Sequence, residues 1–315
     1  MKLLYGVLLS NILLFALLAI LCCALPACSD TNTPSTTTSN PTAPASNPAT
    51  PSVPAAAPAV GDLLVFPTRF IFDMKKRSAE VTVINIGKTT ATYRISLIHE
   101  RMSESGTMTD ITTPAPGELF VDELVRFTPR QVILDPHVAQ VIRIQLRKPE
   151  NLASGEYRSH MLFRAVPKAE AVDPAQKPDG NTLGIHLTPI YGVSIPLIVR
   201  HQTTAATTAL SEATVSQTTT PEHQWKASLR LNRSGDESTY GDLLVTLSGG
   251  SHAGEVVGKL GGVAVYTPNK SRTVSIDLHL PQGVTTLSGR RLLINYQQKS
   301  EDGGATLAQT TVDVP

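Results

Sequence analysis

The sequence has few of the residues that carry most enzyme chemistry. None of its three cysteines lies beyond residue 28, so the part that folds has neither a disulfide nor a thiol nucleophile. Its eight histidines show no metal-ligand spacing such as His-x-x-x-His. The chain also has no Gly-x-Ser-x-Gly motif and no phosphate-binding glycine loop. These absences predict a protein that is not an enzyme and that uses no metal or cofactor.

Charge and aromatic residues are also sparse. The formal net charge of +1 gives no reason to expect a nucleic-acid partner. Aromatic residues make up 5% of the chain, whereas Val, Thr and Ile are plentiful in short alternating segments that end in Gly, Pro, Asn or Asp. This pattern predicts antiparallel strands joined by turns. The 315 residues fit two modest domains, so we expect an all-β protein with two immunoglobulin-like sandwiches, at 61–201 and 202–315.

The N-terminus indicates export. A short basic start is followed by a long apolar run that ends in Leu25-Pro26-Ala27-Cys28. A leucine, a spacer and a small residue before cysteine resemble the site at which bacterial lipoprotein signals are cut and the cysteine is lipidated. Residues 1–28 are therefore expected to be a lipoprotein signal with Cys28 lipidated, a signal cleaved near Ala24 or Ala27, or an uncleaved membrane helix. Each alternative places the folded part in the periplasm, and the lipid or the uncleaved helix would also anchor it to the membrane.

Residues 29–60 are dominated by Thr, Pro, Ala, Ser and Asn and show no apolar period. Such a segment cannot bury a core and is typical of an extended, semi-rigid spacer. Next to an anchored N-terminus, it would act as a tether.

The segment from Leu183 to Arg200 has an apolar residue at every odd position. Period two with β-branched residues predicts a strand. Two prolines, Pro189 and Pro196, argue against a central strand paired along both sides. We therefore expect an edge strand whose apolar row can pair with another chain; a bent strand crossing between two domains is the alternative.

An ordered set of short motifs between Leu63 and Arg200 resembles the PapD-like periplasmic pilus chaperones. No single motif is specific, but their order is. They are Pro67-x-Arg69, Glu80-Val81 leading to Asn85, Tyr93-Arg94, Phe127-x-Pro129, Leu134-x-Pro136, Gln140-x-x-Arg143 and Glu156-x-x-Ser159.

The resemblance implies a function and roles for particular residues. Members of this family hold a pilus subunit whose sandwich lacks its last strand, and they lend the last strand of their first domain. Here that donor strand would carry Leu187, Tyr191, Val193 and Ile195. Arg69 would grip the terminal carboxylate of the subunit. The expected partners are a pilus or related surface-structure subunit and an outer-membrane usher.

The same resemblance implies an internal ion pair between Arg143 and Glu156 near the domain junction. The sequence also departs from the family. Pro196 stands where the family has a lysine that pairs with the cleft arginine, and Pro189 removes a backbone donor from the lent strand. The alternative function is accordingly a membrane-tethered protein of this fold that acts in structure or interaction without lending a strand.

Overall fold

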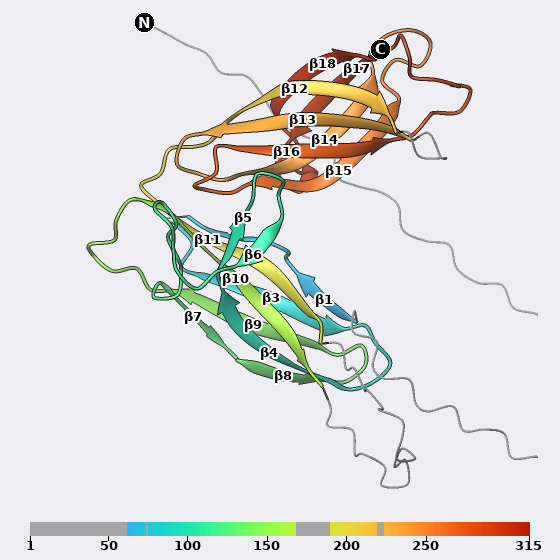
Figure 1. The fold of residues 1–315 in the computed structure, drawn as a ribbon. Coiled ribbons are helices and arrows are strands. Elements are labelled where there is room, and N and C mark those ends of the chain that lie inside the picture. Colours follow the sequence, from blue (N-terminus) through green and yellow to red (C-terminus); the bar gives the residue numbers. More distant parts are fainter. Residues whose placement is uncertain (1–61, 74, 168–189, 219–223) are drawn as a thin grey trace, which may run out of the picture. The chain divides into compact units, whose positions relative to one another are not determined.

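The chain folds into two β-sandwiches, which confirms the predicted all-β class (Figure 1). The computed structural model describes residues 62–73, 75–167, 190–218 and 224–315. The predicted signal at 1–28, the tether at 29–60, Cys28, Leu187 and Pro189 lie outside these residues. No helix in the described ranges is long and apolar enough to cross a membrane.

The first sandwich consists of two sheets and a hairpin. One sheet has the order β1 (Leu63–Phe66), β3 (Ser78–Asn85), β9 (Ala139–Leu146) and β7 (Val125–Thr128). The other has the order β2 (Phe70–Phe72), β11 (Gly192–His201), β10 (Gly155–Val166), β4 (Ala91–Ile98) and β8 (Gln131–Leu134). The hairpin is formed by β5 (Glu100–Met102) and β6 (Met108–Asp110).

The second sandwich follows after a short connection. One sheet has the order β12 (Thr207–Gln217), β13 (Trp225–Ser234) and β16 (Ser271–Leu278). The facing sheet has the order β15 (Val256–Val265), β14 (Thr239–Leu247), β17 (Arg291–Gln297) and β18 (Thr306–Asp313). A single 3-10 turn, Ser300–Asp302, joins β17 to β18.

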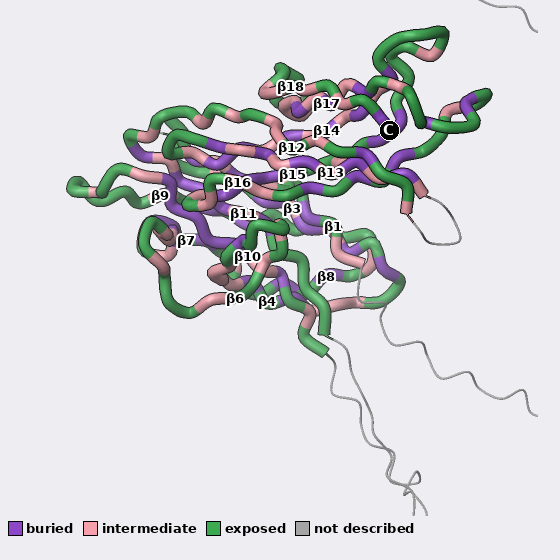
Figure 2. The backbone as a smooth tube through the Cα atoms, turned by 45° about the horizontal axis from the view of Figure 1, so that its top comes forward, coloured by how far each residue is buried: buried purple, intermediate pink, exposed green. Residues whose placement is uncertain are grey.

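Each sandwich has its own hydrophobic core. Burial alternates along strands such as β13 and β14 (Figure 2), because successive side chains of a strand point to opposite faces. One core cluster gathers residues from Val65 to Val199, and the other gathers residues from Val215 to Val314. The division between the cores falls in the short stretch between β11 and β12, close to the predicted domain boundary at 201 and 202.

A third, smaller apolar cluster contains residues from both sandwiches. Its buried members are Met102, Ile198, Ala264 and Tyr266. The hairpin that carries Met102 also makes polar contacts with the second sandwich, since Asn269 Nδ2 donates to the Met102 carbonyl (2.7 Å) and Thr273 N donates to the Glu104 carbonyl (2.7 Å). The hairpin is thus a point of attachment between the two sandwiches.

The prediction of an edge strand is correct for only half of β11. β11 pairs with β10 over its whole length, Gly192 to His201. On its other side, β2 pairs with it in parallel, but only from Leu197 to Val199. Within the described part of the chain, the edge from Gly192 to Pro196 therefore has no strand beside it. Pro196 directly precedes the stretch from Leu197 to Val199, in which β11 is paired on both sides.

Asn85 anchors the end of β3, and its removal gives a test of the first sandwich. Its buried amide donates to the carbonyls of Thr89 (2.8 Å) and Leu134 (2.9 Å) and accepts from the backbone of Gly87 (2.9 Å). We expect Asn85→Ala to lower the free energy of unfolding by about 1–3 kcal/mol, because the buried backbone groups lose their partners. Urea unfolding measures this, with the exposed Gln131→Ala as control. Equal effects of the two substitutions would contradict it.

Candidate functional site

The alternating apolar side chains from Leu197 to Tyr191 pass from the core to the surface where the edge of β11 has no neighbouring strand among those described. Leu197 and Ile195 are 0% and 3% exposed and belong to the first core, whereas Val193 and Tyr191 are 36% and 54% exposed. These residues alternate along one face of the strand. Ile195, which was expected among the donor side chains, is packed in the core of its own sandwich. Val193 and Tyr191 are accessible.

Arg69 lies beside this edge. It directly precedes β2, whose Phe70 stands opposite Leu197 of the parallel strand β11. Arg69 and Pro196 are each one residue earlier, so they lie next to each other on neighbouring strands. The structure thus brings Pro196 to the side of Arg69, and a proline offers no charge there.

The Arg69 guanidinium is enclosed but incompletely bonded. Its carbon Cζ lies 4.3 Å from the centroid of the Tyr240 ring, which belongs to β14 of the second sandwich. Nε and Nη2 are buried and have no hydrogen-bond partner among the described residues. Desolvation lowers the pKa of Arg69, yet a guanidinium stays charged in proteins. Two buried, charged donors without acceptors are a favourable site for an anion.

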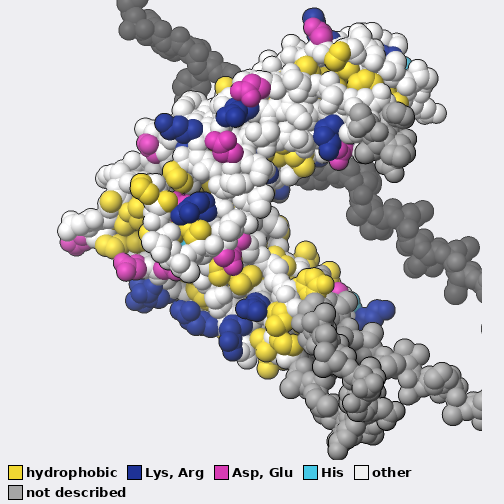
Figure 3. Space-filling model, in the orientation of Figure 1, with side chains coloured by type: hydrophobic (Ala, Val, Ile, Leu, Met, Phe, Trp, Pro, Cys, Tyr) yellow, Lys and Arg dark blue, Asp and Glu magenta, His cyan; other side chains and the backbone are white. Residues whose placement is uncertain are grey.

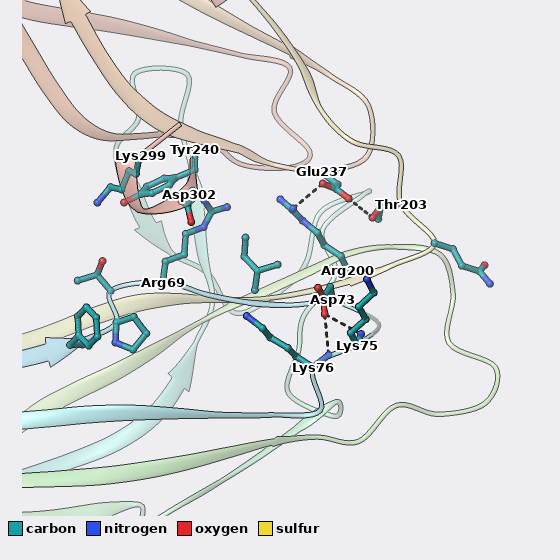
Figure 4. A pocket seen from close by; sticks show the side chains of 15 residues that line it. Arg69, Asp73, Lys75, Lys76, Arg200, Thr203, Glu237, Tyr240, Lys299 and Asp302 are labelled. Atoms are coloured by element: carbon teal, nitrogen blue, oxygen red, sulfur yellow. Dashed lines mark hydrogen bonds and ion pairs between the residues drawn. The ribbon is translucent and has the colours of Figure 1, made fainter. Parts of the chain in front are cut away.

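Basic side chains surround these donors. Lys and Arg side chains gather along the lower edge of the first sandwich in Figure 3. Basic residues also line a cavity of about 1070 Å³ around Arg69. The charged residues of its wall are Arg69, Asp73, Lys75, Lys76, Arg200, Glu237, Lys299 and Asp302 (Figure 4). Phe66, Pro67, Ile71 and Tyr240 add an apolar portion. The wall suits an organic anion with an apolar body.

Arg200 lines the same cavity but is already neutralised. Its Nε donates to Glu156 Oε2 (3.0 Å), its Nη2 to the Ser238 carbonyl (3.0 Å), and its Nη1 lies 2.9 Å from Glu237 Oε2. Two carboxylates and a carbonyl thus take up this guanidinium. It is therefore a poor substitute for the lysine that Pro196 replaces.

Glu156 is the centre of a buried hydrogen-bond network. Besides Arg200, its carboxylate accepts from the backbone of Ser238 (2.9 Å), from the Ser238 hydroxyl and from the Thr267 hydroxyl (3.2 Å). The side chain is completely buried, and a buried carboxylate requires such compensation. Because Ser238 and Thr267 belong to the second sandwich, this network joins it to β10 and β11.

The predicted ion pair between Arg143 and Glu156 is wrong. Arg143 lies on β9 and Glu156 on β10, which belong to different sheets. Arg143 stands opposite Glu80 in the β3–β9 ladder, and its Nε lies 3.3 Å from Glu80 Oε1, with both side chains largely exposed. Sequence spacing indicates that each charge needs a partner, but it does not say which strands pair.

A second group of buried ionisable residues escaped the sequence analysis. His160 and Arg158 of β10 are 4% and 8% exposed, and the Arg158 guanidinium stacks on Tyr266 at 4.3 Å. His160 Nδ1 lies 3.1 Å from Glu100 Oε2. Desolvation and, to a smaller extent, the charge of Arg158 lower the pKa of His160 to about 3. Desolvation raises the pKa of Glu100. The available signal was the run of three polar residues from Arg158 to His160, which directly precedes the apolar run Met161 to Phe163.

The comparison with solved structures finds chaperones at low sequence identity. No protein-family model and no curated protein matches the chain. Among solved structures, the YadV chaperone is 13% identical with a TM-score of 0.40, over 80% of this chain and 98% of that one. The class 5 fimbriae chaperone CfaA is 16% identical with a TM-score of 0.37, over 80% and 99%. The CupB2 chaperone of Pseudomonas aeruginosa is 12% identical with a TM-score of 0.38, over 80% and 100%.

The two carboxylate–arginine pairs, one buried and one exposed, give a matched test. We expect Glu156→Ala to lower the free energy of unfolding by about 3–5 kcal/mol, because it leaves Arg200 and two hydroxyl donors without their buried acceptor. Glu80→Ala should cost about 0–1 kcal/mol, as is typical of an exposed pair. Chemical denaturation of both variants measures the difference. Similar losses would mean that the Glu156 network does not stabilise the fold.

The buried His160 predicts a pH dependence of stability. In the unfolded chain a histidine titrates near pH 6.5, whereas the folded pKa is about 3. Below pH 6.5 the unfolded state therefore binds a proton that the folded state does not. The free energy of unfolding should fall as the pH falls from about 6.5 to 3, by up to about 1.4 kcal/mol per unit. His160→Gln should flatten this decline in a series of urea titrations. The exposed His279→Gln is the control, and an unchanged slope in His160→Gln would contradict the prediction.

Proposed function

We propose that the protein is an exported, non-catalytic chaperone that binds subunits of a pilus or related surface structure by lending them a strand. The observation that carries this proposal is the half-open edge of β11. From Gly192 to Pro196 the strand is paired with β10 alone among the described strands. An unpaired edge with an exposed apolar row is the element that strand addition requires, because main-chain pairing gives affinity and side-chain pockets give selectivity.

Val193 and Tyr191 are the side chains that would enter the client. They continue the row that Leu197 and Ile195 begin inside the first core. A client strand that pairs with this edge would bury them, and each large apolar side chain contributes about 1.5–3 kcal/mol when it is removed from water. Leu187 belongs to the same alternating row in the sequence.

Arg69 supports the same proposal, because it would hold the end of the client segment that pairs with β11. Its buried, unpaired donors lie beside the end of the open edge, so a terminal carboxylate held there would set the register of a strand along β11. A one-residue slip would turn every client side chain to the other face. An anchored end therefore adds selectivity as well as affinity.

The expected setting is the periplasm, with the N-terminus cleaved or retained in the membrane through a lipid on Cys28 or a helix. The resemblance to PapD-like chaperones, together with the leader-like residues 1–28, supports this location. An outer-membrane usher is the further partner that such a role implies.

The test is purification of the full tagged chain from its native periplasm with any partner bound. We expect a one-to-one partner whose own sequence encodes an incomplete sandwich. The double substitution Tyr191→Ser and Val193→Ser should reduce its recovery by at least about tenfold, since two apolar contacts are lost. The neighbouring Ile190→Ser is the matched control, because Ile190 is also exposed (44%) but lies outside β11 and outside the alternating row.

Two results would contradict the proposal. One is recovery of no such partner by the native chain. The other is full recovery with the double variant, which would leave a tethered structural or interaction protein as the function.

A further inference from the structure

Large apolar side chains are exposed around one corner of the first sandwich, on the outer face of the sheet that contains β1, β3 and β9. Each keeps between 39% and 50% of its surface accessible, whereas their strand neighbours Val65 and Ile142 are buried in the core. A group of exposed apolar side chains of this kind is typical of an interaction surface. We call it the apolar corner, and its members are Leu64, Ile86, Val138 and Val141.

Two members of the apolar corner lie on the strands that flank β3 (Figure 1). Leu64 of β1 stands opposite Ile84 of β3, and Val141 of β9 stands opposite Thr82 of β3. Residues two apart on a strand point to the same face, as do residues directly opposite each other on paired strands. Leu64, Ile84 and Val141 therefore form one apolar area across three strands.

The other two members lie on neighbouring turns that are bonded to each other. Asn85 N donates to the Val138 carbonyl (3.3 Å), and His137 N donates to the Asn85 carbonyl (2.7 Å). The buried side chain of Asn85 holds the first of these turns from inside. Because Ile86 directly follows Asn85, the backbone keeps Ile86 and Val138 close to each other.

The backbone of the apolar corner is already bonded within the protein. Ile86 N donates to the Asp62 carbonyl (2.6 Å), and Val138 N donates to the Asp135 carbonyl (3.1 Å). The strands β1 and β9 are paired with β3 along the corner. A surface that enters lipid must meet this condition, because the hydrocarbon offers no partner for a free N–H group.

The place of the corner along the chain indicates what covers it. Asp62, to which the turn of Ile86 is bonded, is the first described residue, and 61 residues precede it. The sequence predicts that the apolar run ending at Cys28 reaches the membrane and that residues 29–60 form a spacer. An extended spacer of this length spans at most about 100 Å. A weak contact between the corner and that membrane is then intramolecular, at an effective concentration in the mM range.

We propose that the apolar corner contacts the phospholipid bilayer to which the N-terminus is attached, with its side chains at the boundary between headgroups and acyl chains. Lys88 and Asp135 carry opposite charges on the same two turns, so apolar burial rather than lipid charge holds the corner there. The open edge of β11 belongs to the other sheet and stays free for a client. The contact does not depend on the lending of a strand.

Tryptophan fluorescence tests the contact. The chain has one tryptophan, Trp225, which is buried in the second sandwich and gives a constant background. The full chain with Val138→Trp is reconstituted into vesicles of equal parts phosphatidylethanolamine and phosphatidylglycerol, with or without bromine on the acyl chains. Bromine quenches a tryptophan that touches the lipid. Val256→Trp is the matched control, since Val256 is also exposed but lies on β15 of the second sandwich.

We expect brominated lipid to reduce the emission of Val138→Trp at least about twofold more than that of Val256→Trp. Adding Leu64→Ser and Ile86→Ser to Val138→Trp should lower the quenching to the level of Val256→Trp, because the apolar contacts are lost. Adding Ile133→Ser instead should leave it unchanged, since Ile133 is equally apolar and exposed but lies on β8 of the other sheet. Thermal unfolding checks that each variant is folded.

Three results would overturn the proposal. Equal quenching of Val138→Trp and Val256→Trp would show that the corner does not touch lipid. Undiminished quenching in the variant that also carries Leu64→Ser and Ile86→Ser would show that the spacer alone brings the sandwich to the bilayer. An emission of Val138→Trp that moves to shorter wavelength with rising protein concentration, without quenching by bromine, would mean that a second copy covers the corner. None of these results bears on whether β11 lends a strand.

Discussion

The short parallel pairing between β2 and β11 determines which part of the edge of the first sandwich is left without a neighbouring strand. Three residue pairs, from Phe70 with Leu197 to Phe72 with Val199, close part of the β11 edge and leave the stretch from Gly192 to Pro196 open. The same pairing fixes where β2 begins, and so it places Arg69 at the junction of the closed and open halves. The open edge of β11, the position of Arg69 and the point at which the apolar row leaves the core therefore all follow from this one pairing.

The second sandwich contributes chemistry as well as bulk. Tyr240 supplies the ring on which Arg69 stacks, and Ser238 and Thr267 satisfy the buried carboxylate of Glu156. Since a guanidinium stacked on an aromatic face keeps its in-plane donors available, Tyr240 orients Arg69 without consuming its hydrogen bonds. The site belongs to neither sandwich alone.

The sequence predicted the parts of this structure that depend on local pattern. Period-two alternation and turn residues are local signals, so the strands and the two sandwiches could be anticipated, whereas the position of Arg69 beside Pro196 was implied only by the family resemblance. Which strands pair, and which side chains they bury, does not depend on the local sequence pattern. The spacing of Arg143 and Glu156 does not reveal that their strands lie in different sheets. Ile195 and Val193 look alike in the alternating row, and only the extent of the facing sheet makes one core and the other surface. The stacking of Arg69 on Tyr240 joins residues far apart in the sequence, and no local pattern indicates it.

The hairpin of β5 and β6 has a consequence for how the molecule loses its structure. It buries Met102 with Tyr266 and bonds its backbone to Thr273, at a place far along the chain from the connection between β11 and β12. The two sandwiches are thus joined at the connection and again at the hairpin, and melting of either would expose apolar surface on the other. Heat absorption during unfolding should then follow a single cooperative transition rather than two separate ones.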